Sequence, residues 1–211
     1  VKHTNLDQYR LAKEDLFEVL QMWDNEIRSK LLLVACGGTA LTLLGHKETT
    51  KDVDFLIPIP AQYEVLVKTL LKLGYTEKTG TGYMHPNNPW IFDLYSGQTV
   101  FQTSFIEPIH NDGLHLVIER YQRIILACLN FEDLIISKMF RGTSVDVDDS
   151  VLLIESEGLD LVSLFERYRE TASYYFDPPT CKFNLGLLID QLEEKQFDVG
   201  TIRELHRQWN P

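Results

Sequence analysis

The sequence has no uninterrupted apolar stretch long enough to cross a bilayer, although 44% of its 211 residues are hydrophobic. A transmembrane helix needs about 20 consecutive apolar residues. The first residues also lack the basic and apolar segments of a secretory leader. We therefore expect a cytoplasmic protein without a membrane partner, whose apolar content is sufficient for a full core.

Cysteine is scarce, and histidine shows no metal-binding pattern. Cys36, Cys128 and Cys181 lie far apart in apolar surroundings, and no two of them form a Cys-x-x-Cys pair. This arrangement favours reduced thiols in a core over disulfides or a zinc site. The six histidines have no ligand spacing either, so we expect them at the surface or in loops.

Positive charge is also in short supply. Lysine and arginine together number 20 against 31 acidic residues, which gives a formal net charge of −11. A protein that coats nucleic acid without sequence preference needs a basic stripe, so the composition argues against that class. A local basic groove remains compatible with the total, because part of the negative charge can belong to a metal site.

Against this background, Asp52 and Asp54 stand out, because they are separated only by Val53 and precede an apolar run. Side chains alternate between the two faces of a strand, so both carboxylates would share one face. Two such carboxylates repel unless a cation lies between them, and oxygen ligands suit Mg²⁺. The alternative is a solvated strand end, which is the commoner meaning of an isolated Asp-x-Asp.

A glycine pair lies a short distance upstream. Gly37, Gly38 and Thr39 follow the apolar residues 31–36 and precede a helical pattern that ends at Gly45. Glycine allows the backbone to approach a phosphate, and a helix N-terminus attracts anions. Thr39 would cap the helix or bind a phosphate oxygen. The alternative is an ordinary turn.

A third aspartate, Asp93, lies within the apolar segment 90–95. A charged side chain in such a run needs a reason, because burying an unpaired charge is costly. One reason is a third metal carboxylate that accepts a proton from an attacking hydroxyl group. The alternative is a salt bridge or an edge position.

The apolar pattern predicts a mixed sheet with helices, followed by helices only. We predict helices over residues 7–23, 39–44 and 62–73, with strands over 31–36, 53–59, 75–79, 90–95, 114–119 and 123–129. From residue 131 we predict helices only: one that starts at Asn130 or Glu132 and ends at Gly142, followed by helices at 147–157, 159–176, 182–195 and 199–209. The domains would be a core with an N-terminal helix at 1–130 and a helical region at 131–211 that packs on it.

These motifs resemble those of the DNA polymerase β-like nucleotidyltransferase superfamily in its small, minimal form. The matching residues are Gly37, Gly38 and Thr39, then Asp52 and Asp54, then Asp93. The resemblance implies an α+β nucleotidyltransferase fold, with a mixed, twisted sheet flanked by helices and a C-terminal helical region. It also implies a Mg²⁺- or Mn²⁺-dependent enzyme that transfers a nucleoside monophosphate from a nucleoside triphosphate such as ATP.

In this resemblance the three aspartates hold two metal ions, and Asp93 also helps to deprotonate the acceptor hydroxyl. Lys47 and Thr50 stand in the approach to the aspartate pair and are implied to contact the nucleotide. The arginine often found there is absent, and a lysine supplies charge without a bidentate fork.

Residues 132–138, followed by Asp146 and Asp149, are similar to a helical pair in the abortive-infection toxin branch of the superfamily. That resemblance implies that Lys138 contacts the phosphates and that Asp146 supports the site. Val145 occupies the position where the branch usually has a basic residue. The implied acceptor is tRNA or a protein, with a cognate toxin or antitoxin as partner; a small molecule such as an aminoglycoside is a further alternative.

Two other interpretations belong to different functional classes. The chain could keep the fold without turnover, as a nucleotide-binding or antitoxin-type regulatory protein. Separately, the aromatic residues of the predicted helix 159–176, namely Tyr168, Tyr174, Tyr175 and Phe176, could pair two copies into a homodimer. Packing into the core is the alternative for that helix.

Overall fold

A computed structural model describes residues 10–211 of the chain, which divide into two compact units. The first unit contains the chain up to Gln98 together with Glu107–Leu129. The second contains Thr99–Ile106 and Asn130–Pro211. Each unit is described by itself below.

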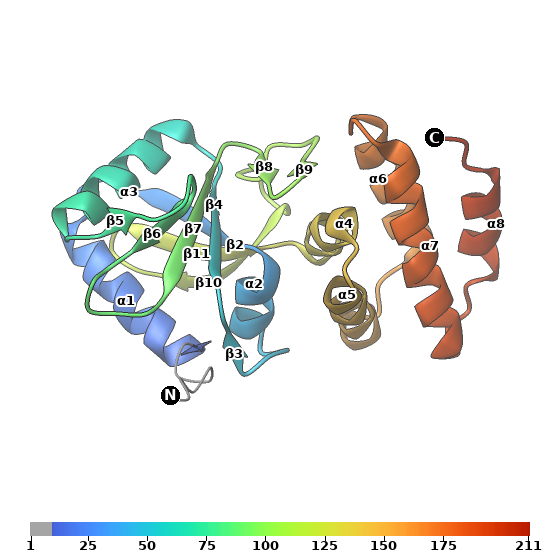
Figure 1. Ribbon diagram of the computed structural model, residues 1–211, viewed down its shortest axis with the longest axis horizontal. Helices are drawn as coiled ribbons and strands as arrows, with labels where there is room; N and C mark the ends of the chain where they lie inside the picture. Colours follow the sequence, from blue (N-terminus) through green and yellow to red (C-terminus); the bar gives the residue numbers. More distant parts are fainter. Residues whose placement is uncertain (1–9) are drawn as a thin grey trace, which may run out of the picture. The chain divides into compact units, whose positions relative to one another are not determined.

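The first unit is built on a mixed sheet in the strand order β10-β11-β2-β4-β7-β6-β5 (Figure 1). The pairs β11/β2 and β4/β7 are parallel, and the remaining neighbours are antiparallel. This confirms the α+β fold class with a mixed sheet. The strands are β2 (Leu31–Ala35), β4 (Val53–Ile57), β5 (Thr76–Glu77), β6 (Gly82–Met84), β7 (Ile91–Ser96), β10 (His115–Arg120) and β11 (Ile124–Leu129).

The helices of this unit are α1 (Lys13–Glu26), α2 (Gly37–Leu44) and α3 (Pro60–Lys72). Figure 1 shows α1 and α3 lying side by side along the sheet. Trp23 of α1 packs on Phe92 of β7 with ring centroids 4.9 Å apart. Phe92 therefore faces this helix layer, and the alternation of the strand directs its neighbour Asp93 to the opposite face.

The N-terminal segment differs from the predicted helix over 7–23. Residues 7–9 lie outside the described residues, and the chain then forms a short strand, β1 (Leu11–Ala12), before α1 begins. This strand pairs antiparallel with β3 (Thr49–Thr50). The helical spacing of the apolar residues was misleading here, because Leu11 is buried through a strand pairing with a distant segment.

The second unit is helical apart from a small hairpin of β8 (Thr99–Val100) and β9 (Thr103–Ser104). Its helices are α4 (Phe131–Arg141), α5 (Ser144–Glu157), α6 (Leu161–Ser173), α7 (Pro178–Glu194) and α8 (Gly200–Gln208). Tyr168 is part of its core and donates a hydrogen bond to the carbonyl of Cys181 at 2.9 Å. Tyr174 and Phe176 are instead 73% and 86% exposed, so the predicted aromatic surface is split between core and solvent.

The cysteines are all buried. Burial raises the pKa of the Cys128 thiol to about 12 and that of Cys181 to about 11, so both remain protonated near neutral pH. Of the described helices, none combines the length and the apolar character that crossing a bilayer requires.

A buried carboxylate ties α1 to the sheet. Asp24 is only 2% exposed, and its carboxylate accepts backbone hydrogen bonds from Arg123 at 2.6 Å, Ile124 at 2.7 Å and Gln122 at 3.1 Å. These N–H groups belong to the start of β11 and the turn before it. Since a buried carboxylate is tolerated only when its oxygens are satisfied, Asp24 fixes where this strand begins.

We predict that Asp24→Ala lowers the free energy of unfolding by about 3 kcal/mol, because it leaves buried backbone donors without an acceptor. Urea denaturation measures this change. The exposed Glu18→Gln on the same helix serves as control and should alter stability by less than about 0.5 kcal/mol. Equal stability of the two variants would contradict this role of Asp24.

Candidate functional site

The glycine pair forms the tight connection between β2 and α2. Gly37 has φ 55°, a left-handed conformation that side chains disfavour, and α2 begins at this residue. The predicted helix start at Thr39 was therefore two residues late. Cys36 occupies the N-cap position and provides no side-chain cap, so Thr39 does not cap the helix.

The hydroxyl of Thr39 instead binds the backbone of the aspartate pair. It donates to the carbonyl of Asp52 at 3.1 Å and accepts from the N–H of Asp54 at 2.9 Å. The hydroxyl of Thr50 donates to the same carbonyl at 2.7 Å. Two threonines thus hold the Asp52 carbonyl and anchor the segment 52–54 against the first turn of α2.

Asp52 lies in a bend immediately before β4, which begins at Val53. The predicted strand start at residue 53 agrees with β4, so Asp52 precedes the strand and the alternation of β4 does not by itself place its side chain on the face of Asp54. The physical reason is the capture of the Asp52 carbonyl by side-chain hydroxyls, which takes it away from the strand ladder. Asp52 is exposed, whereas Asp54 is 8% exposed within the strand.

Asp54 and Asp93 are direct neighbours across the parallel pair β4/β7. Residues at one register level of neighbouring strands project to the same face of a sheet. Asp93 is half-buried, while its strand neighbours Phe92 and Leu94 are buried on the opposite face. The structure thus brings together two of the three predicted carboxylates from segments that are distant in sequence.

Asp93 is held by the neighbouring strand. The hydroxyl of Thr81 donates to Asp93 Oδ1 at 2.8 Å, and Gly82 stands opposite Asp93 in the β6/β7 register. A Cβ atom at Gly82 would lie 3.1 Å from that same carboxylate oxygen and 2.9 Å from Cγ2 of Ile91. Glycine at this position therefore leaves room for the carboxylate to take its hydrogen bond from Thr81.

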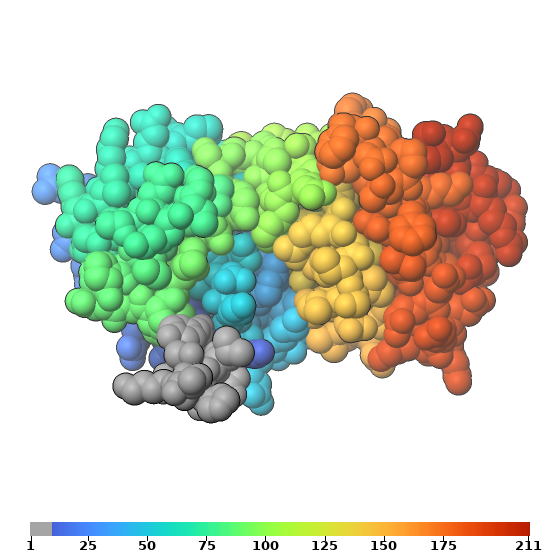
Figure 2. All heavy atoms as spheres, in the orientation of Figure 1, coloured from blue at the N-terminus to red at the C-terminus, as the bar shows by residue number. Residues whose placement is uncertain are grey.

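A surface hollow of about 420 Å³ opens beside the glycine turn. Its lining includes the cations Arg10, Lys47 and Lys51 and the acid Glu48, together with Gly38, Thr49 and Thr50. Figure 2 shows the beginning of the described chain, in blue, against the cyan segment that contains β3. The predicted residues Gly38, Lys47 and Thr50 thus lie together in one basic depression.

The carboxylates suit a metal ion whose remaining ligands are supplied by the substrate and by water. Among residues 10–211, no three His, Cys, Asp or Glu side chains stand close enough together to hold a metal ion by themselves. Asp54 and Asp93 are adjacent across the sheet, and Asp52 is the exposed third carboxylate. Mg²⁺ in phosphate-transferring sites is commonly held by one or two carboxylates plus substrate phosphates and water, so this donor set suits it.

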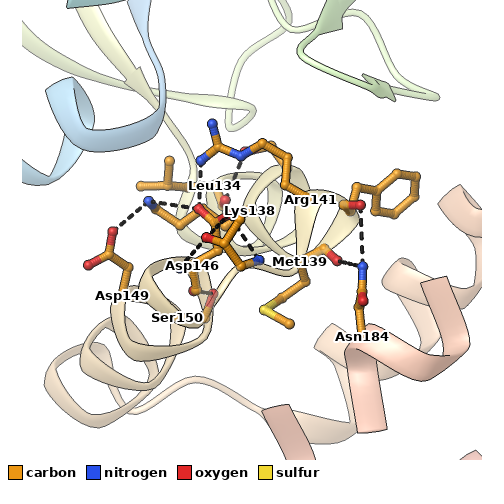
Figure 3. Close-up of polar contacts among 11 residues, drawn as sticks. Leu134, Lys138, Met139, Arg141, Asp146, Asp149, Ser150 and Asn184 are labelled. Atoms are coloured by element: carbon orange, nitrogen blue, oxygen red, sulfur yellow. Dashed lines mark hydrogen bonds and ion pairs between the residues drawn. The ribbon is translucent and has the colours of Figure 1, made fainter. Parts of the chain in front are cut away.

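Lys138 and Asp146, the remaining predicted site residues, belong to the second unit, where both are buried (Figure 3). Lys138 is 1% exposed, and its Nζ lies 2.8 Å from Asp149 and 3.9 Å from Asp146. Arg141 binds Asp146 at 2.6 Å. Burial lowers the pKa of the Lys138 amine, and the Asp149 carboxylate opposes that shift. This network joins α4 to α5.

The end of α4 is packed closely against α7. Gly142 ends the helix with φ 65°, and a Cβ atom there would lie 2.3 Å from Cγ of Asn184. Asn184 uses this space to donate to the carbonyls of Met139 at 3.0 Å and Phe140 at 3.3 Å, as Figure 3 illustrates for Met139. Asn184 thus joins α7 to the end of α4, the helix that also carries Lys138.

The sequence matches no family model and no curated protein. The fold, however, is similar to that of the crystal structure of ANT(2'')-Ia in complex with adenylyl-2''-tobramycin, with a TM-score of 0.51 at 14% identity over 75% of this chain and 95% of that one. The solution structure of the antibiotic-resistance factor ANT(2'')-Ia gives a TM-score of 0.52 at 14% identity, over 77% and 94%. The chain has the nucleotidyltransferase fold.

Likeness at this identity establishes the fold alone, and the abortive-infection branch stays a prediction. The structure also adds residues that the sequence motifs did not assign to the candidate site. Arg10 and Lys51 line the basic hollow, and Thr81 and Gly82 support Asp93. Lys51 adjoins Asp52 in the sequence, which was a usable signal. Thr81 lies in the bend before β6 and Gly82 is the first residue of that strand, which is too short to show an alternating pattern.

The close contact at Gly38 gives a testable coupling. A Cβ atom at Gly38 would lie 3.0 Å from Oγ1 of Thr50, the atom that holds the Asp52 carbonyl. We predict that Gly38→Ala and Thr50→Ala are non-additive in urea denaturation, with a coupling of about 1 kcal/mol in favour of the double variant. Gly80→Ala, where the new methyl group meets nothing within 4 Å, should be additive with Thr50→Ala. Additivity at Gly38 would refute the contact.

Proposed function

We propose that this protein transfers a nucleoside monophosphate from a nucleoside triphosphate to an acceptor hydroxyl. The observation that carries the proposal is the register of β4 and β7, which makes Asp54 and Asp93 neighbours. A basic hollow adjoins this pair through the hydrogen-bonded segment 50–54. Paired carboxylates next to an anion-attracting helix start are the arrangement that phosphate transfer requires, because catalysis there consists mainly of positioning and charge neutralisation.

The triphosphate would bind at the start of α2. The first N–H groups of a helix have no partner within that helix, and they favour an anion. Gly38 lets the phosphate approach the backbone, and Lys47 adds positive charge at the hollow. Since the Thr39 and Thr50 hydroxyls already hold the Asp52 carbonyl, we assign both threonines to shaping this binding segment.

Asp52, Asp54 and Asp93 would hold the divalent cations. Mg²⁺ or Mn²⁺ bound there would neutralise the phosphate charge and stabilise the attacking and leaving oxygens. Asp54 lies within its strand and is nearly buried, while Asp52 is exposed and would contact the cation from the bend before β4. Asp93 would accept the proton of the acceptor hydroxyl at Oδ2, because Thr81 already binds Oδ1.

Lys138 and Asp146 have a different part in this proposal. The ammonium group of Lys138 is held by Asp149 and Asp146, so in this arrangement it stabilises the α4–α5 junction. Direct contact of Lys138 with the nucleotide phosphates would require the amine to exchange these carboxylates for phosphate oxygens.

The acceptor is proposed only as a class of hydroxyl compounds. The ANT(2'')-Ia structure contains an adenylylated aminoglycoside, which supports a test with small hydroxylated molecules. The abortive-infection resemblance supports tRNA or a protein, with a cognate toxin or antitoxin as partner. The negative net charge disfavours a large nucleic-acid footprint but allows contact with a tRNA end.

The proposal is tested by incubating the protein with each α-labelled nucleoside triphosphate, Mg²⁺, and tRNA, cell lysate or aminoglycosides. We predict that label enters one acceptor class and that Asp54→Asn and Asp93→Asn each reduce this transfer by at least about 100-fold. Their unfolding temperatures should stay within about 4 °C of wild type, since removing one of two adjacent like charges does not destabilise the folded state.

Asp112→Asn, in an exposed loop, is the matched control and should keep full activity. Full activity of either site variant would remove that aspartate from the mechanism. Nucleotide binding without product in any acceptor class would instead support the non-catalytic regulatory alternative.

The contact between Thr81 and Asp93 generates a further prediction. Thr81→Val removes the hydrogen bond to Oδ1 while keeping the shape of the side chain, so we predict a roughly tenfold lower kcat with KM for the nucleotide unchanged. Thr81→Ser retains the hydroxyl and should recover most of the rate. Thr76→Val, at an exposed position of the same sheet, is the control. A Thr81→Val enzyme with wild-type kcat would show that this contact does not position Asp93.

A further inference from the structure

The hydroxyl group of Thr81 is bound to the carboxylate to which the proposed function assigns proton transfer. Thr81 Oγ1 donates to Asp93 Oδ1 at 2.8 Å, and both residues are half-buried. A general base must lie within hydrogen-bond reach of the proton that it accepts, which is about 2.6–3.2 Å between heavy atoms. The pair therefore has the geometry of a nucleophile and its base.

Two other threonines of the candidate site have a different partner. Thr39 and Thr50 donate their hydroxyl protons to the backbone carbonyl of Asp52. A hydroxyl group is a weak nucleophile until an adjacent base accepts its proton, and a carboxylate serves as such a base whereas a peptide carbonyl does not. Of these three hydroxyls, only that of Thr81 is bound to a group that can activate it.

Thr81 is also held in place by its backbone neighbours. Its carbonyl accepts from the N–H of Leu94 at 2.9 Å, and the N–H of the next residue, Gly82, donates to the hydroxyl of Thr79 at 2.9 Å. Gly82 stands opposite Asp93 and places no side chain beside the carboxylate. A hydroxyl that is already fixed next to its base reacts without the entropic cost of bringing the two groups together.

We propose that this protein transfers a nucleoside monophosphate to its own Thr81 when no other acceptor is bound. This inference rests on the proposed function and adds to it a modification site within the chain. Thr81 Oγ1 forms a bond to the α-phosphorus of the nucleoside triphosphate, while the bond from that phosphorus to the oxygen of the leaving pyrophosphate breaks. The hydroxyl proton passes to Asp93 Oδ1. The products are a phosphodiester on Thr81 and free pyrophosphate.

This modification would impede further transfer. An esterified Oγ1 has no proton to donate, so the hydrogen bond from Thr81 to Asp93 would be lost. The new phosphodiester would also add a negative charge next to the neighbouring carboxylates Asp54 and Asp93. An acceptor hydroxyl bound at Asp93 Oδ2 would compete with Thr81 for the same phosphorus, so a bound acceptor would protect the protein from self-modification.

The test incubates the full chain with each α-labelled nucleoside triphosphate and Mg²⁺ in the absence of an acceptor, and then applies intact-mass and peptide mass spectrometry. We expect wild type to gain a nucleoside monophosphate on Thr81. Thr81→Val should stay unlabelled, whereas Thr81→Ser should be labelled because serine retains the hydroxyl group. Thr76→Val is the matched control and should be labelled like wild type, because the Thr76 hydroxyl donates to the carbonyl of Met84 rather than to a carboxylate. Label on another residue, or wild-type labelling of Thr81→Val, would overturn the inference.

A mixing experiment tests whether the reaction takes place within one molecule. Asp93→Asn keeps the Thr81 hydroxyl without the base, and Thr81→Val keeps the base without the hydroxyl. When the two variants are mixed with labelled nucleotide, we expect neither chain to be labelled. Unfolding temperatures verify that both are folded, and transfer to an external acceptor verifies that Thr81→Val is active. Label on the Asp93→Asn chain would show that one molecule modifies another, which contradicts the inference.

The outcomes separate this inference from the proposed function. Transfer by wild type to an external acceptor, with Thr81 unlabelled when that acceptor is left out, would refute self-modification and leave the proposed function intact. Labelled Thr81 without transfer to any external acceptor would support self-modification and refute transfer to a separate molecule. Absence of label from the chain and from every acceptor would refute both. Preincubation with nucleotide alone should also lower the later transfer rate of wild type but not that of Thr81→Val, a difference that a purely structural role of Thr81 would not produce.

Discussion

The carbonyl group of Asp52 is the point on which the candidate site depends. Hydroxyl groups of Thr39 and Thr50 bind this single oxygen, and Thr39 also accepts from the N–H of Asp54. The same hydrogen bonds lie where the segment after α2 meets β4. They also join that segment to Thr39, next to the glycine turn. Thr50 leaves no room for a side chain at position 38. The contact between Gly38 and Thr50 therefore affects both the glycine turn, which is the candidate phosphate-binding segment, and the segment that carries Asp52 and Asp54.

Buried charges in both units are used to fix where elements begin and end. In the first unit, Asp24 receives the backbone donors at the start of β11. In the second, Lys138 joins α4 to α5 through Asp149 and Asp146, and Arg167 of α6 binds Asp133 of α4 at 2.8 Å. Burial raises the pKa of Asp133, and the guanidinium group of Arg167 opposes that shift. Because breaking such a pair leaves a charge uncompensated, these contacts favour one arrangement of each unit over its alternatives.

Much of the fold could be read from the sequence because its strongest signals are local. The apolar run before the glycine pair, the strand of Asp54 and the apolar segment around Asp93 all lie where they were predicted, within a few residues. The errors have physical causes: Leu11 fits a helical pattern but pairs as a strand, and the three residues of β6 are too few to show an alternating pattern. The sequence motifs identify Asp54 and Asp93 as candidates, but only the register of β4 and β7 makes them neighbours. The position of Arg10 likewise depends on a strand pairing between distant residues.

The parallel pairing of β4 with β7 has a consequence for how the protein is made. Parallel strands cannot be joined by a tight turn, and here the connection runs through α3, β5 and β6. The two central carboxylates therefore meet only after a long stretch of chain has been synthesised and has closed upon itself, which is a slow type of contact during folding. A nascent chain that ends before β7 contains Asp54 but not Asp93, and the edge of β4 that pairs with β7 has no partner strand. The two carboxylates therefore become neighbours only when this part of the sheet forms.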